Sequence, residues 1–149
     1  MTDEVKGFDE GKFREDYAML ENAKAQLDAL VKQQRLIQLA IEEHVRARET
    51  VKSLKKGDPG DDILIPVGAD SYIHASISQN RDAVVGVGSA ISIRKNPEEA
   101  EKILDSKIDD LSRAFKSVSD RAAQTEAYIQ EISEKVQQQY DLLQSGRER

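Results

Sequence analysis

The sequence has no cysteine and no tryptophan, and it has only three prolines in 149 residues. Without cysteine the chain can form no disulfide, no thiol nucleophile and no cysteine-ligated zinc site, a composition typical of a reducing compartment. Aromatic residues make up 5% of the chain and charged residues 34%. Such a composition favours long solvated helices over a thick globular core. A chain of this length is expected to form a single domain over residues 1–149.

The chain also has no surplus of positive charge and no long apolar run. Its 22 basic and 28 acidic residues give a formal net charge of -6, whereas a nucleic-acid surface needs clustered cations. No window approaches the ~18 apolar residues of a membrane span, and acidic residues stand where a signal peptide would be basic and then apolar. We therefore expect no nucleic-acid partner, no membrane partner and a cytoplasmic location.

A heptad pattern runs through the C-terminal third of the chain. Apolar residues recur at alternating steps of four and three from Leu104 to Leu143, and only Thr125 and Gln139 are polar. This spacing predicts a coiled-coil helix. The segment NPEE at residues 96–99 supplies an N-cap, a proline at the first helical position and a carboxylate at the third. The helix is therefore expected over residues 97–145.

A looser apolar stripe occupies residues 13–51, where three polar residues interrupt it. The stripe ends before Lys55 and Lys56, whose charges suit the negative end of a helix dipole. Gly57 is expected to adopt the left-handed conformation that often terminates a helix, and Pro59 cannot continue one. A second helix is therefore predicted over residues 10–56.

Between these helices the apolar period changes to two and β-branched residues become frequent. The pattern predicts strands over residues 63–67, 71–77, 83–87 and 90–93, arranged as two hairpins within residues 62–94. Four short strands leave edges unpaired and a face uncovered, so we expect them to pack against one another or against partner subunits. The residues predicted to be buried in this assembly are Ile63, Ile65, Val67, Ile73, Ile77, Val85, Val87 and Ile91.

Two long helices can bury both stripes by folding back on each other within one chain. The predicted fold class is therefore mainly α with a small β module: a long antiparallel two-helix coiled coil with two β-hairpins between the helices. In this arrangement both chain ends lie together at one tip, away from the strands.

Two strings between the predicted helices resemble a known family. They are IPVGADSYI at residues 65–73 and VGVGSA at residues 85–90. With the order of helix, strands and helix over nearly the whole chain, they resemble the archaeal-type α-class subunit of prefoldin, a chaperone also called GimC. Four strands match the α class, because the smaller β-class subunits have a single hairpin. Family members often carry a second glycine where this chain has Ala90.

The resemblance implies a hetero-hexamer of two α-class and four β-class subunits, joined through their β modules. It implies an ATP-independent molecular chaperone that captures unfolded or nascent proteins at its coiled-coil tips and delivers them to a group II chaperonin. Several weak contacts on separate arms would hold such a client through effective concentration. The alternative is a structural or tethering coiled-coil subunit of a multiprotein complex that holds no client.

An enzyme is not expected, because no nucleophile, base and orienting group can be assembled from identifiable spacings. The two histidines, His44 and His74, lie in different segments without other ligands at metal-site spacing. We therefore predict no catalytic residue, no metal and no cofactor.

Apolar residues near both chain ends are the candidates for client contact. Each of them could instead flank and shield the coiled coil, as residues beside a heptad seam do. The off-seam candidates are Phe8, Tyr17, Met19, Tyr140 and Leu142, and the seam candidates are Phe13, Leu20, Val136 and Leu143.

Overall fold

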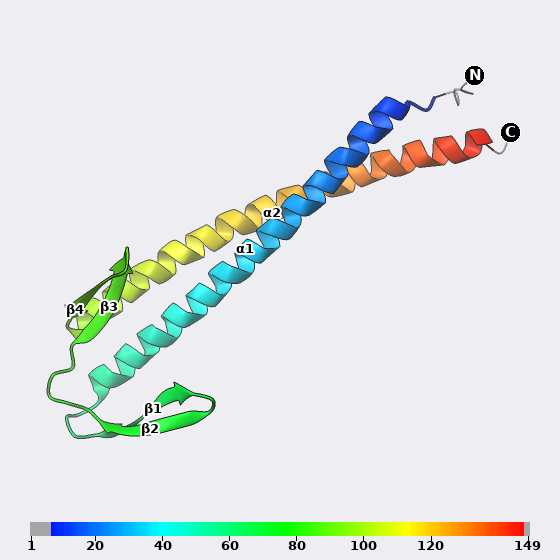
Figure 1. Cartoon of the computed structure of the whole chain (residues 1–149). Coiled ribbons are helices and arrows are strands. Elements are labelled where there is room, and N and C mark those ends of the chain that lie inside the picture. The colour runs from blue at the N-terminus through cyan, green and yellow to red at the C-terminus, as the bar shows by residue number, and fades with distance from the viewer. Residues whose placement is uncertain (1–6, 148–149) are drawn as a thin grey trace. The chain divides into compact units, whose positions relative to one another are not determined.

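The structure is a computed structural model that describes residues 7–147. In chain order, four strands lie between two long helices, which confirms the predicted fold class (Figure 1). The elements are α1 (Glu10–Lys56), β1 (Asp62–Gly68), β2 (Ser71–Ser76), β3 (Ala83–Gly88), β4 (Ile91–Lys95) and α2 (Pro97–Arg147).

Side-chain caps define where both helices begin. The backbone N–H of Glu99 donates to Oδ1 of Asn96 at 2.8 Å, as the NPEE segment predicts. The backbone N–H of Lys12 donates in the same way to Oδ1 of Asp9 at 3.0 Å, a cap that the sequence analysis did not identify. Helix α2 extends to Arg147, past its predicted end at residue 145.

The end of α1 differs from the prediction at Gly57. Its backbone N–H donates to the carbonyl of Ser53 at 3.2 Å, which continues the helical pattern, and the left-handed glycine in this connection is Gly60, with φ of 93°. The prediction that Gly57 adopts a left-handed conformation is therefore wrong. A Cβ atom on Gly57 would lie 2.6 Å from Cδ1 of Ile77. A larger residue at position 57 would therefore require the end of the Ile77 side chain to move.

The chain divides into two compact units. One comprises the residues up to Ile37 and those from Ala114 onward, and we call it the helical unit. The other comprises Gln38–Arg113 and contains all four strands, and we call it the hairpin unit.

Helices α1 and α2 run antiparallel in the helical unit and bury their heptad seams against each other. Leu30, Val118 and Ala122 form a buried cluster, with Leu27 and Ile37 packed against it. Full burial of an aliphatic side chain of this size stabilises a fold by about 1.5–3 kcal/mol. All predicted seam positions of α2, from Leu104 to Leu143, are buried or half-buried.

Two hydrogen bonds between polar side chains also cross the seam of the helical unit. Nε2 of Gln34 donates to Oγ of Ser119 at 2.8 Å. Nε2 of Gln139 donates to Oδ2 of Asp16 at 3.0 Å. These pairs fix the register of the two helices, because a shift of either helix would leave half-buried polar groups without partners.

The hairpin unit contains two separate two-stranded antiparallel sheets, β1–β2 and β3–β4. Ile65 pairs with Ile73 in the first hairpin, and Val85 pairs with Ile93 in the second. Strand β4 begins at Ile91 and not at the predicted residue 90, because Ser89 and Ala90 form the turn.

The second hairpin packs on the helices of its unit. Val85, Ala100 and Leu104 form a buried cluster, against which Val51 and Ile103 pack. Helix α1 joins this end of α2 through Arg48, whose Nη1 lies 3.0 Å from Oδ1 of Asp105. This hydrogen bond to Asp105 raises the pKa of the Arg48 guanidinium.

Candidate functional site

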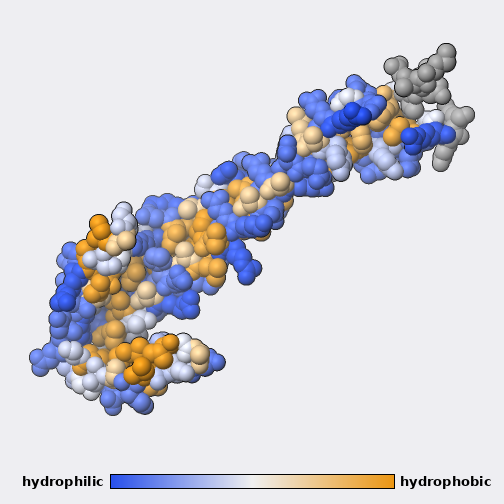
Figure 2. All heavy atoms as spheres, viewed as in Figure 1, coloured by the Kyte–Doolittle hydropathy of each residue, from blue (hydrophilic) through white to orange (hydrophobic). Residues whose placement is uncertain are grey.

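Large apolar side chains lie exposed near the ends of both helices in the helical unit. Tyr17 is 51% exposed, Met19 42%, Tyr140 45% and Leu142 44%. All four are off-seam residues that the sequence analysis selected. Hydrophilic side chains cover most of the surrounding helix surface, as the blue areas of Figure 2 show. The exposed residues therefore form apolar points on an otherwise hydrated surface.

Three aromatic side chains near the start of α1 form a continuous row. The ring centroids of Phe8 and Phe13 are 5.6 Å apart, and those of Phe13 and Tyr17 are 6.4 Å apart. Phe8 and Phe13 are half-buried, whereas Tyr17 projects into solvent. Offset aromatic contacts of this kind hold the rings in place, so the row presents a firm apolar surface.

The other candidates of the helical unit lie in the seam. Leu20 is 5% exposed and Val136 and Leu143 are half-buried, so their side chains face the opposite helix. These side chains therefore pack mainly within the coiled coil.

Tyr128 extends the exposed apolar surface and was missed from the sequence. It is 45% exposed, and its hydroxyl lies 3.9 Å from Sδ of Met19 on the other helix. Tyr128 has the same off-seam spacing as Tyr17, but it lies farther from the chain ends, where no client contact was predicted. Met19 and Tyr128 thus form one surface that both helices supply.

The second candidate surface is the pair of hairpins. Of the predicted assembly residues, Val85 is buried, and Ile63 and Ile77 are half-buried. The remaining five are at least 44% exposed in the single chain, and Figure 2 shows hydrophobic surface on the hairpins. These exposed residues are Ile65, Val67, Ile73, Val87 and Ile91.

An apolar groove separates the first hairpin from the last turns of α1. Its volume is about 530 Å³. Leu54, Ile63 and Ile65 supply apolar side chains to its lining, and Glu49 is also part of the lining. The groove explains why the first hairpin exposes more apolar surface than the second: the hairpin does not pack closely on the helix beside it.

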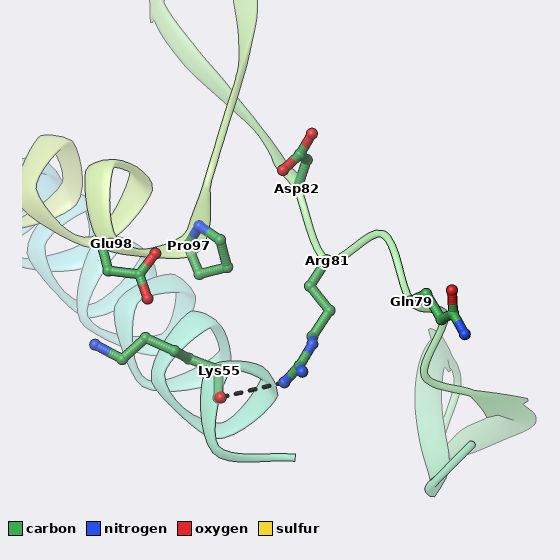
Figure 3. A pocket seen from close by; sticks show the side chains of 6 residues that line it. All are labelled: Lys55, Gln79, Arg81, Asp82, Pro97 and Glu98. Atoms are coloured by element: carbon green, nitrogen blue, oxygen red, sulfur yellow. Dashed lines mark hydrogen bonds between the residues drawn. The ribbon is translucent and has the colours of Figure 1, made fainter. Parts of the chain in front are cut away.

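A smaller pocket of about 320 Å³ lies where the hairpins join, and its lining is polar (Figure 3). Nη1 of Arg81 donates to the carbonyl of Lys55 at 3.3 Å and also to that of Gly57. These carbonyls belong to the end of α1, where backbone acceptors have no partner within the helix. Arg81 therefore caps the helix, a role that sequence reasoning missed because the residue is distant from α1 in the chain.

The described residues offer no metal centre, since no group of three or more His, Cys, Asp or Glu side chains among them is placed to hold an ion. Nδ1 of His44 lies 2.7 Å from the carbonyl of Ala40, one turn earlier in the same helix.

Within residues 7–147, no helix combines the length and the apolar character needed to cross a membrane.

The chain is similar to proteins of one family. The family model described as "Prefoldin subunit" matches residues 23–142. The chain is 30% identical to prefoldin subunit alpha of Pyrococcus horikoshii over 85% of this chain and 84% of that protein. It is also 30% identical to prefoldin subunit alpha of Thermofilum pendens, over 84% of this chain and 95% of that protein.

Solved structures agree with this similarity. A chain of filamentous prefoldin from Methanocaldococcus jannaschii matches with a TM-score of 0.64 and 26% identity, over 76% of this chain and 93% of that one. The prefoldin beta subunit from Thermococcus strain KS-1 shares the fold alone, with a TM-score of 0.57 and 15% identity, over 85% of this chain and 90% of that one. The relatives named as alpha subunits confirm the predicted resemblance to the α class. The chain belongs to the prefoldin family, whose members are chaperone subunits and not enzymes.

Proposed function

We propose that this chaperone subunit captures unfolded or nascent proteins on the exposed apolar residues near its helix ends, without ATP. The observation that carries the proposal is the exposure of Tyr17, Met19, Tyr140 and Leu142 at off-seam positions. Packing of the coiled coil does not account for them, because the seam is filled by other residues. Apolar side chains that two helices expose together suit the apolar segments that unfolded proteins expose.

Each contact with a client is weak on its own. Partial burial of one exposed side chain stabilises a complex by about 1–2 kcal/mol, at 25 cal/mol per Å². Several arms that act on one client raise the effective concentration of the remaining contacts. Weak contacts in parallel hold the client and still allow its release one contact at a time.

The proposed assembly contains two copies of this chain and four β-class prefoldin subunits, joined through the hairpins. Two observations support it: the exposed apolar residues of the hairpins, and the relatives that are named as alpha subunits of prefoldin. We further propose that the assembly works in the cytoplasm and transfers its clients to a group II chaperonin. Family membership supports both statements.

An aggregation assay tests the proposal. The chain is reconstituted with a β-class subunit, and light scattering follows the aggregation of a chemically denatured client after dilution without ATP. Serine replaces Tyr17, Met19, Tyr140 and Leu142 together. Because these residues are exposed and off the seam, the substituted assembly should form normally but lose most of its suppression of aggregation.

The control replaces three apolar residues outside this surface that are at least 49% exposed, Val31, Leu36 and Leu39, with serine. The control should suppress aggregation as the unchanged chain does. Full suppression by the first variant, in an assembly of unchanged native mass, would leave a tethering role as the better account. An equal loss in both variants would show that apolar content in general, and not this surface, holds the client.

A further inference from the structure

Met19 carries the one thioether of the described residues 7–147, since the other of the chain's two methionines is Met1. The chain has no cysteine, so it offers no thiolate that would compete for an oxidant. Met19 is 42% exposed, whereas its chain neighbour Leu20 is 5% exposed in the seam. A small oxidant can therefore reach the sulfur of Met19 in the folded chain.

A phenol lies beside this sulfur. The hydroxyl of Tyr128 on α2 is 3.9 Å from Sδ of Met19 on α1. A thioether is only a weak hydrogen-bond acceptor. Tyr128 is itself 45% exposed, so the pair is open to solvent on both sides. The hydroxyl therefore has a donor that the reduced sulfur uses poorly.

Oxidation of the sulfur changes this pair. It converts the apolar thioether into a polar, chiral sulfoxide. The new oxygen is bonded to Sδ, so on the side that faces Tyr128 it lies closer to the hydroxyl than the sulfur does. Its partial negative charge also makes it a better acceptor than the sulfur. The structure thus provides a donor for the oxidised form of Met19.

We propose that Met19 is a peroxide-sensitive modification site, at which the hydroxyl of Tyr128 donates to the sulfoxide oxygen once it has formed. A lone pair of Sδ attacks one oxygen of hydrogen peroxide, the O–O bond breaks and an S–O bond forms. The other oxygen leaves as hydroxide, which takes the proton from the oxygen now on sulfur and becomes water. The sulfur is oxidised by two electrons, and the peroxide is reduced by two. A sulfoxide reductase reverses the change, with two thiols that become a disulfide while the oxygen leaves as water.

The modification removes apolar surface where client capture is proposed. Met19 and Tyr128 form one exposed surface that both helices supply. In the oxidised form a polar group replaces the thioether, and an apolar client segment has to break a hydrogen bond in order to cover it. We expect the oxidised assembly to bind clients about threefold to tenfold less tightly. This consequence rests on the proposed function, whereas the oxidation and the hydrogen bond do not.

Mass spectrometry tests the modification itself. The full chain is assembled with a β-class subunit, treated with dilute hydrogen peroxide and digested, and the peptide that contains Met19 is followed for the gain of one oxygen atom. The rate should be within about tenfold of the rate in the urea-unfolded chain, because the sulfur is exposed. A rate slower than this in the assembly would overturn the inference.

Amide hydrogen exchange tests the hydrogen bond. Tyr128→Phe keeps the ring and removes the hydroxyl. Oxidation of Met19 should speed exchange in the helix turns around residues 19 and 128 at least about threefold more in the Tyr128→Phe assembly than in the unchanged one, because no donor then holds the sulfoxide. Equal effects of oxidation in the two assemblies would show that Tyr128 does not donate to it, and the inference would fail.

The aggregation assay tests the consequence, and each assembly is compared with its own untreated sample. Peroxide should raise the concentration of the unchanged assembly needed for half suppression by about threefold to tenfold. A sulfoxide reductase with a dithiol should reverse this loss. Peroxide should not alter suppression by the Met19→Leu assembly, which accounts for oxidation of the β-class subunit.

The matched control combines Met19→Leu with Leu36→Met, which moves the thioether to a position on the same helix that is 68% exposed in the natural chain. Its oxidation should leave suppression unchanged. No loss on complete oxidation of Met19, or an equal loss in this control, would overturn the inference. The serine variant of Tyr17, Met19, Tyr140 and Leu142 shows which idea has failed. If that variant loses suppression while oxidation has no effect, the inference alone is wrong, and if that variant also suppresses fully, the proposed function is wrong as well.

Discussion

Asp16 of α1 accepts a hydrogen bond from Gln139 of α2 at 3.0 Å, so one layer of the seam near the helix ends is polar. Both residues are half-buried, and Oε1 of Gln139 is buried without a hydrogen-bond partner in the described structure. A polar layer of this kind specifies the register of a coiled coil and lowers its stability. The helix ends are therefore less stable than a fully apolar seam would make them.

Replacement of this layer by leucine should stabilise the chain. The double variant Asp16→Leu with Gln139→Leu should raise the free energy of unfolding by about 1–2 kcal/mol, because two half-buried polar side chains become apolar ones. Gln139→Leu alone should gain much less, since it leaves the carboxylate of Asp16 half-buried without its donor. Urea unfolding followed by circular dichroism, at one fixed chain concentration, measures both. A double variant no more stable than the single variant would contradict the assigned hydrogen bond.

The buried cluster of the helical unit should dominate its stability. Leu30→Ala removes most of a side chain that is 4% exposed and should lower the free energy of unfolding by about 2–4 kcal/mol. Leu36→Ala is the matched control, because Leu36 lies on the same helix but is 68% exposed, and its effect should stay within about 0.5 kcal/mol. Equal losses in the two variants would show that the seam does not lie where the structure places it.

Loss of the Arg81 cap should loosen the end of α1. Arg81→Ala removes the donors for the carbonyls of Lys55 and Gly57 and should cost about 1 kcal/mol. Hydrogen exchange of the Gly57 amide, which bonds to Ser53, should become faster. Arg81→Lys should restore part of the protection, because a lysine can reach the same carbonyls with fewer donors. Arg35→Ala, on the exposed face of α1, should change nothing measurable.

The turn of the second hairpin should accept glycine with a gain in stability. Ala90 has φ of 57°, a left-handed conformation that costs a residue with a Cβ atom about 1–2 kcal/mol. Ala90→Gly should therefore raise the free energy of unfolding by about 1 kcal/mol. The opposite sign is expected for Ala127→Gly in the middle of α2, which should lose about 1 kcal/mol of helix propensity. A loss in both variants would mean that residue 90 is not left-handed.

Features with a repeating pattern could be predicted from the sequence. The period of Leu104 to Leu143 indicated the seam, and the Asn96 cap indicated the start of α2. Asp16 also lies at a seam position. The apolar pattern did not reveal this, because Asp16 is charged and the residue that donates a hydrogen bond to it, Gln139, lies on the other helix. Arg81 was missed for a related reason: its acceptors are brought near only by the folded chain.

The sequence predicted the position of Gly57 at the end of α1 but not its backbone conformation. Gly57 stands at the helix end as expected, but it lies next to the side chain of Ile77 and is not left-handed. A local sequence pattern does not report a contact between residues so far apart in the chain. The exposure of the client-surface candidates could be predicted only in part. Spacing separated Tyr17 from Leu20, yet it did not reveal that Tyr128 would lie beside Met19.

The two hairpins reverse direction by the same device. A Val-Gly pair, Val67-Gly68 in one and Val87-Gly88 in the other, precedes two left-handed residues, and the strand register shifts at the same point in both. The two turns thus have the same backbone conformation and differ in their side chains. A binding partner therefore distinguishes the two hairpins by their side chains alone. Point substitutions can change the binding preference of a hairpin while its turn stays the same.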